Sequence, residues 1–237
     1  ILGSSLLSSK AFNDFATKVF ESDFGNVEYS EGVINSVSVV IIRRHLFDKS
    51  QPYTIPSELN YKAMIMTFKK LGCERIIGFY SVGSLKESIP LCSIVVPDDY
   101  AYLGAPPHIL NDYSSHFVPS LDMEMRERVI QILKENGFSP VCGGTYFQTF
   151  GPRFETKAEI RFYQAFFEYV GMTGACEATL AQEQGMGLCM VGLVDNMAHG
   201  LGEPLTVERF KALQESNKVL MEEVVNTVIQ RVCESYI

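Results

Sequence analysis

The sequence lacks the features that mark several common classes of protein. It has no apolar run approaching the ~18 residues of a membrane-spanning helix, and Ile1 to Gly3 are too short to act as a signal peptide. Its formal net charge is -8, which argues against a nucleic-acid backbone or an anionic membrane surface as the main partner. We therefore expect a cytoplasmic protein with no nucleic-acid or membrane partner, in which a small anion can still bind locally.

The cysteines also lack a recognisable pattern. None forms a C-x-x-C pair, and none has a neighbouring His at zinc spacing. Single cysteines in apolar contexts indicate reduced, buried thiols and no metal site. The positions are Cys73, Cys92, Cys142, Cys176, Cys189 and Cys233. The chain begins without Met in a strand-like step, so we expect a few upstream residues to be missing.

What is present points to one large α/β domain spanning residues 1–237. The composition is 46% hydrophobic and 20% charged, which is ordinary for a globular chain with a sizeable core. Apolar runs alternate with amphipathic stretches, as in a sheet with helices on its faces. The expected strands are 27–29, 37–42, 75–82, 91–96, 146–150 and 186–194. The expected helices are 56–71, 120–136 with Ser120 as N-cap, a helix from Lys157, 177–184 and a long one after Thr206, with a loop at 100–119.

The stretch from Gly143 to Glu159 is the richest in local signals. Its strand must end at Gly151-Pro152, because proline has no backbone N–H to donate. Thr156 and Glu159 form a capping-box pattern, so a helix should begin at Lys157. Residues 153–155 then lie on a strand-to-helix connection, which is where open α/β sheets bind ligands. The alternative is that Phe154 and Glu155 only pack and supply an N-terminal charge.

Polar residues also follow other predicted strands. Gly3, Ser4 and Ser5 resemble a strand end that opens into an anion-binding turn. The turn matches neither G-x-G-x-x-G nor a P-loop, so a dinucleotide or nucleoside triphosphate has little support. Arg43, Arg44 and His45 follow a predicted strand. They either lie at a solvated strand end or bind phosphate. No catalytic Ser–His–Asp set or reactive Cys is apparent.

Taken in order, these motifs resemble the trimeric purine nucleoside phosphorylase and methylthioadenosine phosphorylase family. The resemblance covers nearly the whole chain. It is carried by Gly3-Ser4, R-R-H at 43–45, Y-T-I-P-S-E-L-N-Y at 53–61, V-G-S-L-K-E at 82–87, G-P-R-F-E-T-x-A-E at 151–159, V-G-M-T at 170–173 and Asn196. It implies a twisted mixed sheet with barrel-like closure, flanked by helices, in a homotrimer.

The reaction implied by the resemblance is reversible phosphorolysis of a purine nucleoside, with inorganic phosphate as co-substrate and no other cofactor. The motifs assign phosphate binding to Ser4, Arg44, His45 and Thr173, with Ser81 supplying a nearby backbone contact. Met172 would pack on the ribose and Phe154 would stack on the base. Glu155 and Asn196 would form hydrogen bonds with the purine edge. The expected catalytic residues are His45 and Asn196. Each residue taken alone also has a purely structural interpretation.

Three departures from the family pattern leave open a nucleoside-binding homologue without turnover. Ser5 stands where relatives usually have Gly. Tyr80 replaces a smaller Thr or Asn, and Cys176 replaces a customary Pro.

Substrate preference can also be inferred from the resemblance. Adenine-selective relatives carry Asp at the position of Asn196 and Ser at that of Glu155, so we expect a preference for 6-oxopurines. Asp195 points away from the base by default, but a twist at the strand end could bring it there, so it is also predicted to bind substrate.

Val207 occupies the position where relatives that act on a free 5′-hydroxyl have His, which favours a 5′-methylthio group and makes 5′-methylthioinosine the expected best substrate. The alternative is that Val207 only packs the start of its helix. His116 and Phe117 are expected to approach the 5′ end of the nucleoside in a neighbouring subunit, although a loop histidine without a role is an equal alternative.

Overall fold

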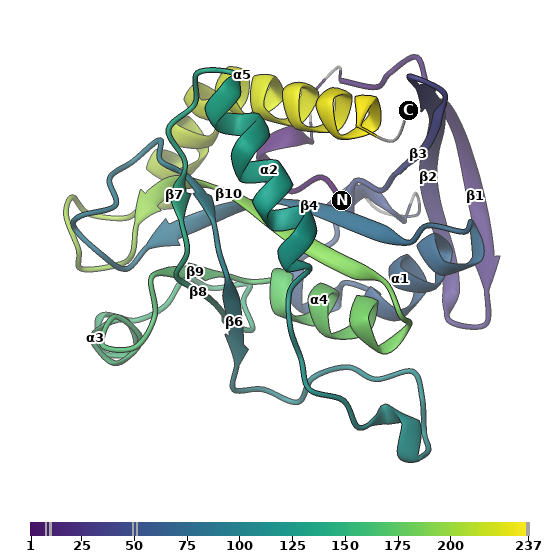
Figure 1. The fold of residues 1–237 in the computed structure, drawn as a ribbon. Helices are drawn as coiled ribbons and strands as arrows, with labels where there is room; N and C mark the ends of the chain where they lie inside the picture. The colour runs from purple at the N-terminus through teal and green to yellow at the C-terminus, as the bar shows by residue number, and fades with distance from the viewer. Residues whose placement is uncertain (8, 10, 49, 51, 236–237) are drawn as a thin grey trace.

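The computed structural model describes residues 1–7, 9, 11–48, 50 and 52–235 (Figure 1). β1 (Ala16–Ser22), β2 (Gly25–Ile34) and β3 (Val37–Ile41) form a small antiparallel sheet. A larger sheet of seven strands has the order β6-β8-β9-β4-β10-β5-β7. Its members are β4 (Arg75–Ser84), β5 (Ile94–Val96), β6 (Asp99–Tyr102), β7 (Val141–Cys142), β8 (Thr145–Gln148), β9 (Tyr169–Gly171) and β10 (Gly187–Met197).

The larger sheet is mixed and curls back on itself. β4 and β10 form a parallel central pair, while β9 and β5 run antiparallel to their central neighbours. Only Pro97 and Asp98 separate β5 from β6, and only Gly143 and Gly144 separate β7 from β8. β5 pairs with β7 at one end of the strand order, and β6 pairs with β8 at the other. Two bent segments therefore join both ends of the sheet, which confirms the predicted barrel-like closure.

Glycine makes this bend possible. Gly143 and Gly144 have φ values of 110° and 93°, a region that residues with a Cβ rarely adopt. The Gly143 N–H donates to the Val96 carbonyl at 3.0 Å, so the two bent segments remain bonded through the turn.

Helices cover both faces of the sheet, as Figure 1 shows. α1 (Tyr61–Lys70) and α4 (Gly174–Glu183) pack on one face, and α2 (Met123–Glu135) and α5 (Val207–Glu234) on the other. Successive residues of β4 serve the two cores, because side chains alternate along a strand. Tyr80 belongs to the core with α1 and α4, and Phe79 to the core with α2 and α5. The predicted α/β class is confirmed.

The predicted starts of α1 and α2 are wrong. Asn60, and not a residue near Pro56, caps α1 by accepting from the Ala63 N–H, and 56–58 form a separate 3-10 turn. Asp122 replaces Ser120 as the N-cap of α2, because its carboxylate accepts from the Met125 N–H. The Ser120 N–H is instead bonded to Gln182. By contrast, the capping box at α3 (Lys157–Tyr163) and the Thr206 cap of α5 are both confirmed.

Some strands and thiols also differ from expectation. β1 was not predicted, because most of its side chains are exposed and give no clear alternation. β6 overlaps the start of the expected loop at 100–119. α4 begins at Gly174, before the expected start at Glu177, and β10 continues through Asp195 and Asn196 with a bulge between Val194 and Asn196. Cys92 and Cys142 are exposed, against the expectation of buried thiols.

Within the described residues, no helix is long and apolar enough to cross a membrane, and no cluster of three potential metal ligands occurs.

Candidate active site

One cavity of about 570 Å³ collects most of the predicted site residues. Its wall includes Ser4, Arg44, His45, Ser81 and Thr173, a group that we call the floor. The wall also includes Phe154, Glu155, Met172, Asn196 and Val207. Asp195, His116 and Phe117 are not part of its wall.

The N-terminal segment brings Ser4 beside Arg44. Leu2 forms a parallel bridge to Arg43, and the Phe79 N–H donates to the Ile1 carbonyl at 2.9 Å. The N-terminal segment therefore lies between the end of β3 and β4. A Cβ on Gly3 would lie 2.8 Å from Nη1 of Arg44, so glycine lets the guanidinium lie against the backbone.

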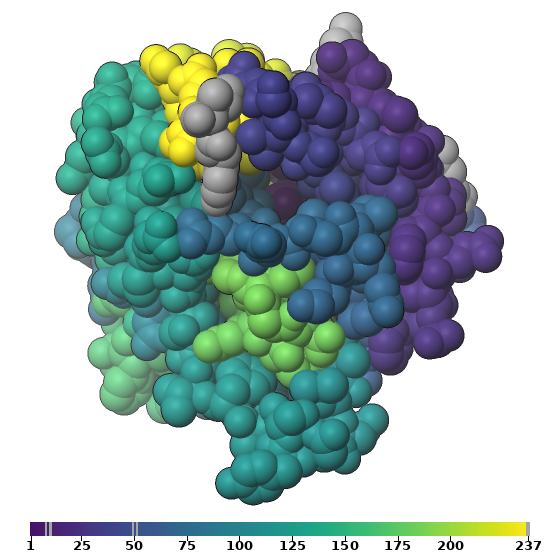
Figure 2. Space-filling view, turned by 45° about the vertical axis from the view of Figure 1, so that its right-hand side comes forward, coloured from purple at the N-terminus to yellow at the C-terminus, as the bar shows by residue number. Residues whose placement is uncertain are grey.

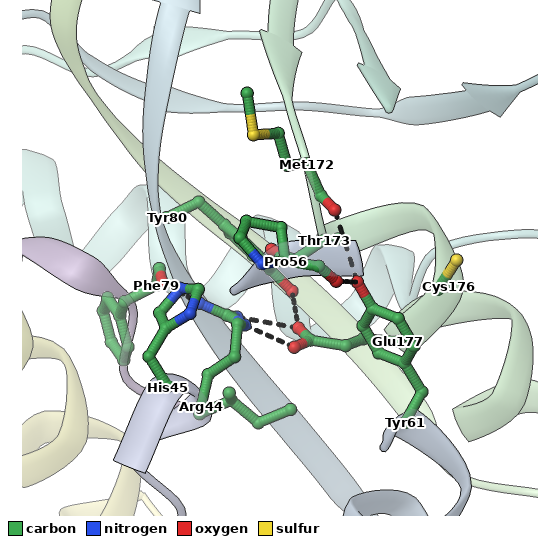
Figure 3. Close-up of polar contacts among 12 residues, drawn as sticks. Arg44, His45, Pro56, Tyr61, Phe79, Tyr80, Met172, Thr173, Cys176 and Glu177 are labelled. Carbon is green, nitrogen blue, oxygen red and sulfur yellow. Dashed lines mark hydrogen bonds and ion pairs between the residues drawn. The ribbon is translucent and has the colours of Figure 1, made fainter. Parts of the chain in front are cut away.

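Arg44 is the buried cation of the cavity. It donates from Nη2 to Glu177 Oε2 at 2.8 Å, from Nε to the other carboxylate oxygen, and from Nη1 to the Phe79 carbonyl at 3.3 Å (Figure 3). Burial by itself lowers the pKa of Arg44, but the Glu177 carboxylate outweighs burial and raises it. The guanidinium thus stays charged, in a fixed orientation at the cavity wall.

His45 supplies a neutral acceptor next to this cation. Its Nδ1 lies 2.8 Å from the Thr54 carbonyl, and because a carbonyl only accepts, Nδ1 carries the proton. The ring stacks on Tyr53 with centroids 4.8 Å apart. Burial, and then the charge of Arg44, lower the pKa of His45 to about 4. At neutral pH the imidazole is therefore uncharged, and Nε2 can accept a hydrogen bond.

A chain of hydrogen bonds links the floor of the cavity to α5. Gln214 Nε2 donates to Ser4 Oγ at 2.8 Å and to Ser81 Oγ at 3.3 Å. Ser81 in turn donates to Asp195, which also accepts from Asn217 at 2.8 Å. Asp195 is therefore buried behind Ser81 and does not line the cavity, so its prediction as a substrate-binding residue is wrong. The side-chain alternation of the strand turns it away from the base.

The start of α4 also contributes to the cavity floor, through Thr173. The Tyr146 hydroxyl accepts from the backbone N–H groups of Thr173 and Gly174, both at 3.2 Å. Thr173 is the N-cap residue, yet its own side chain makes no capping bond. Its hydroxyl is therefore not committed to the helix and lies at the cavity.

The cavity wall also combines an aromatic face, a carboxylate and an amide. Phe154 meets Phe210 edge-on, with centroids 5.1 Å apart. Glu155 is buried and accepts from the Thr149 hydroxyl at 2.6 Å, and burial raises its pKa. Asn196 Nδ2 donates to the Met197 carbonyl at 3.0 Å, which leaves its second hydrogen for a ligand. A Cβ on Gly83 would lie 3.1 Å from this nitrogen, so glycine gives the amide room.

Comparison with known sequences identifies the family. The sequence model of the phosphorylase superfamily matches residues 5–230. The chain belongs to the phosphorylase superfamily. A probable 6-oxopurine nucleoside phosphorylase of Archaeoglobus fulgidus is 37% identical over 84% of this chain and 81% of that protein. A probable S-methyl-5′-thioinosine phosphorylase of Thermodesulfovibrio yellowstonii is 33% identical over 87% of this chain and 80% of its own length.

A solved structure supports the same fold. Methylthioadenosine phosphorylase from Schistosoma mansoni in complex with adenine has a TM-score of 0.80, with coverage of 98% of this chain and 90% of that one. At 22% sequence identity, this likeness shows the phosphorylase fold alone. The family resemblance inferred from the ordered motifs is confirmed.

Two departures of this phosphorylase from its family pattern have visible consequences. Cys176 keeps a backbone N–H that proline would lack, and it donates to Gln148 at 3.0 Å. Ser5 is buried, and its hydroxyl has no hydrogen-bond partner among the described residues. Neither side chain lines the cavity.

The segment that carries His116 and Phe117 projects from this phosphorylase chain, in the teal region between β6 and α2 (Figures 1 and 2). It is tied to α4, because Glu183 accepts from the Ile109 and Leu110 N–H groups. His116 is exposed and stacks on Tyr113, with centroids 5.4 Å apart. Both predicted residues thus lie away from the cavity of their own chain.

Residues of α5 are the part of the site that sequence reasoning missed. Only Val207 was singled out, yet Phe210, Lys211 and Gln214 line the same cavity. The spacing 207, 210, 211 and 214 places all four on one face of a helix. That spacing was a signal in the sequence, although it does not distinguish a cavity wall from a core face.

Proposed function

We propose that this protein is a purine nucleoside phosphorylase, which uses inorganic phosphate to cleave the N-glycosidic bond and releases the purine base and a pentose 1-phosphate. One observation carries the proposal. One cavity is lined by a buried cation with serine and threonine hydroxyls, and also by an aromatic ring, a carboxylate and an amide. The named activities of the two relatives support the same class.

The phosphate half needs a charge, donors and one acceptor. In the proposed complex Arg44 holds two phosphate oxygens, and the hydroxyls of Ser4 and Thr173 donate to the others. Neutral His45 accepts a hydrogen bond from a protonated phosphate oxygen through Nε2, because its Nδ1 proton is committed to Thr54. The phosphate is then held in line with C1′ of the sugar, which gains positive charge as the bond to the base breaks.

The base half must stabilise the departing purine. Phe154 stacks on the ring system, and the free hydrogen of the Asn196 amide donates toward N7 and the 6-oxo group. The Glu155 carboxylate accepts from N1–H, a hydrogen that 6-oxopurines have and adenine lacks. The proposed preference is therefore for hypoxanthine or guanine nucleosides over adenine nucleosides.

The 5′ end of the nucleoside would lie against α5. Val207 and Phe210 present apolar surface there, and neither can donate to a 5′-hydroxyl. Burying a methylthio group gains roughly 25 cal/mol per Å², whereas an unpaired hydroxyl is costly to desolvate. We thus propose 5′-methylthioinosine as the best substrate, with inosine, guanosine and methylthioadenosine behind it. Methylthioadenosine phosphorylase is the second candidate, since a Geobacter sulfurreducens relative with that name is 29% identical over 97% of this chain.

We further propose a cytoplasmic homotrimer in which His116 or Phe117 of a neighbouring subunit completes the 5′ side. The projecting segment supports this proposal, because both residues are held away from their own cavity by the anchor to α4. Light scattering at assay concentration tests the assembly. A monomer would contradict the proposed homotrimer.

The decisive assay measures base release from 5′-methylthioinosine, inosine, methylthioadenosine and adenosine, with and without phosphate. Phosphate-dependent release with matching pentose 1-phosphate is the expected result. Release without phosphate would indicate a hydrolase. Calorimetric binding of nucleoside with no release under either condition would favour a binding homologue without turnover.

A further inference from the structure

Tyr80 contacts both members of the buried ion pair at the cavity floor. Its hydroxyl donates to Glu177 Oε2 at 2.8 Å, the same oxygen that accepts from Arg44. Its ring lies 4.6 Å from the guanidinium carbon of Arg44, within the range of a cation–π interaction. Figure 3 shows the three side chains converging from β4, α4 and the 3-10 turn Arg44–Leu46.

A glycine two positions earlier gives Tyr80 the space for this contact. Residues 78 and 80 of β4 share a face of the sheet. A Cβ on Gly78 would lie 2.1 Å from the Tyr80 hydroxyl oxygen, so any larger residue there displaces the ring. A Cβ on Gly174 would lie 3.1 Å from the same ring. The ring therefore lies in a slot that two glycines leave open.

The contact bears directly on the cation that faces the cavity. Glu177 holds Arg44 in a bidentate pair inside the protein, where an opposite charge competes with any bound anion. A hydroxyl that donates to Glu177 draws carboxylate charge away from Arg44, and the ring face limits how the guanidinium can tilt. Both effects favour an arginine that is held still and is less fully neutralised by its partner.

We propose that Tyr80 is a positioning residue for the phosphate site, which acts on phosphate through Glu177 and Arg44. The inference rests on the proposed function only for the identity of the anion. A smaller residue at position 80 would make neither contact, so this arrangement belongs to this chain and not to the family pattern described above.

Tyr80→Phe keeps the ring and removes the donor. We expect the KM for phosphate to rise about 5- to 10-fold, which is typical for loss of one hydrogen bond to a charged group. The KM for nucleoside, and kcat at saturating phosphate, should change less than about twofold, because no base or sugar contact is lost. Gly78→Ala should raise the phosphate KM in the same direction, and the double variant should be no worse than the worse single variant.

Tyr100→Phe is the matched control. It also removes a partly buried tyrosine hydroxyl that contacts α4, through Thr179 at 3.3 Å, but it lies outside the cavity wall. We expect both KM values to stay at the wild-type level. If Gly78→Ala fails to fold, the comparison of Tyr80→Phe with Tyr100→Phe decides by itself.

Calorimetric titration of phosphate into the enzyme without nucleoside separates this inference from the proposed function. Weaker phosphate binding by Tyr80→Phe, in a protein that shows no phosphorolysis, would uphold the inference and overturn the function. Unchanged phosphate binding in Tyr80→Phe, or an equal rise in both KM values, would overturn the inference while phosphorolysis stands. A wild type that binds no phosphate overturns both.

Discussion

Ser81 and Asp195 lie on the two central strands of the sheet, and the Ser81 hydroxyl donates its only hydrogen to the Asp195 carboxylate. Ser81 lines the cavity, whereas Asp195 is buried behind it. The carboxylate therefore decides which way the serine hydroxyl points. While Asp195 is ionised, Ser81 can accept hydrogen bonds from the cavity but cannot donate to a phosphate oxygen.

Asp195→Asn should reverse this orientation. The amide oxygen can still accept from Asn217, while its nitrogen donates to Ser81 and frees the serine hydrogen for the cavity. We expect the KM for phosphate to fall about threefold at neutral pH, the scale of one modest hydrogen bond. Steady-state kinetics with phosphate varied checks this, with Asn217→Asp as a control that perturbs the same contact from the α5 side. An unchanged or higher phosphate KM in Asp195→Asn would contradict it.

The same substitution should change how stability depends on pH. Burial raises the pKa of Asp195 above its ordinary value of 3.8. The folded state then binds more protons than the unfolded state above pH 3.8, so this residue lowers the free energy of unfolding as pH rises through that window. Urea unfolding from pH 4 to 7.5 should show that Asp195→Asn gains stability relative to the wild type as pH rises. A constant difference would show that Asp195 keeps its ordinary pKa.

His45 should contribute a pH dependence of opposite sign. Its pKa is lowered from 6.5 to about 4, so below pH 6.5 the unfolded state binds a proton that the folded state does not. Stability is therefore lost as pH falls from 6.5 toward 4, by about 3 kcal/mol for a shift of this size. Urea unfolding of the wild type and of His45→Gln over this range measures the effect, and the variant should show the shallower decline.

Breaking the buried pair from one side should be costly. Arg44→Met leaves the Glu177 carboxylate without its counter-charge inside the core. We expect a loss of roughly 3–5 kcal/mol in the free energy of unfolding, and recovery of most of it in Arg44→Met/Glu177→Met. Chemical denaturation of the two variants measures both values. If Arg44→Met were as stable as the double variant, the buried Glu177 carboxylate would not depend on Arg44 for its counter-charge.

Base selectivity should follow Asn196. Asn196→Asp replaces an amide donor with a carboxylate that accepts from a 6-amino group. We expect the ratio of kcat/KM for inosine to that for adenosine to fall by about 10- to 100-fold, equivalent to roughly 1–3 kcal/mol. A wild type that prefers adenosine would refute the proposed 6-oxo preference before any variant is made.

Selectivity at the 5′ position should follow Val207. Val207→His introduces a donor for a 5′-hydroxyl at the start of α5, so kcat/KM for inosine should rise relative to 5′-methylthioinosine by about 10-fold. Val219→His is a control, since this exposed residue of the same helix lies outside the cavity. A wild type that favours inosine, together with no change in Val207→His, would show that Val207 only packs the helix start.

Short-range patterns in the sequence were enough for part of this molecule. The capping box of Thr156 and Glu159 and the Thr206 cap depend on residues three apart, and both were predicted correctly. Ordered motifs identified the family, and most of the site residues predicted from it do line the cavity. The cap of α2 was wrong, because Asp122 and Ser120 are both good caps and the contact of Gln182 with Ser120 decides between them.

The tertiary structure alone decided what the polar side chains do. Arg44 and Glu177 are far apart in the chain, and no local pattern indicates that they form a buried pair or that Tyr80 bonds to it. Strand alternation already favoured opposite directions for Asp195 and Asn196. Only the structure shows the bulge in β10 and the partners Ser81 and Asn217 that hold Asp195 outside the cavity. The sequence by itself determined which chemical groups are available, because motifs and helix caps can be recognised from residues close together in the chain. Only packing across β4, β10, α4 and α5 decided which of these groups are paired and which are free to meet a ligand.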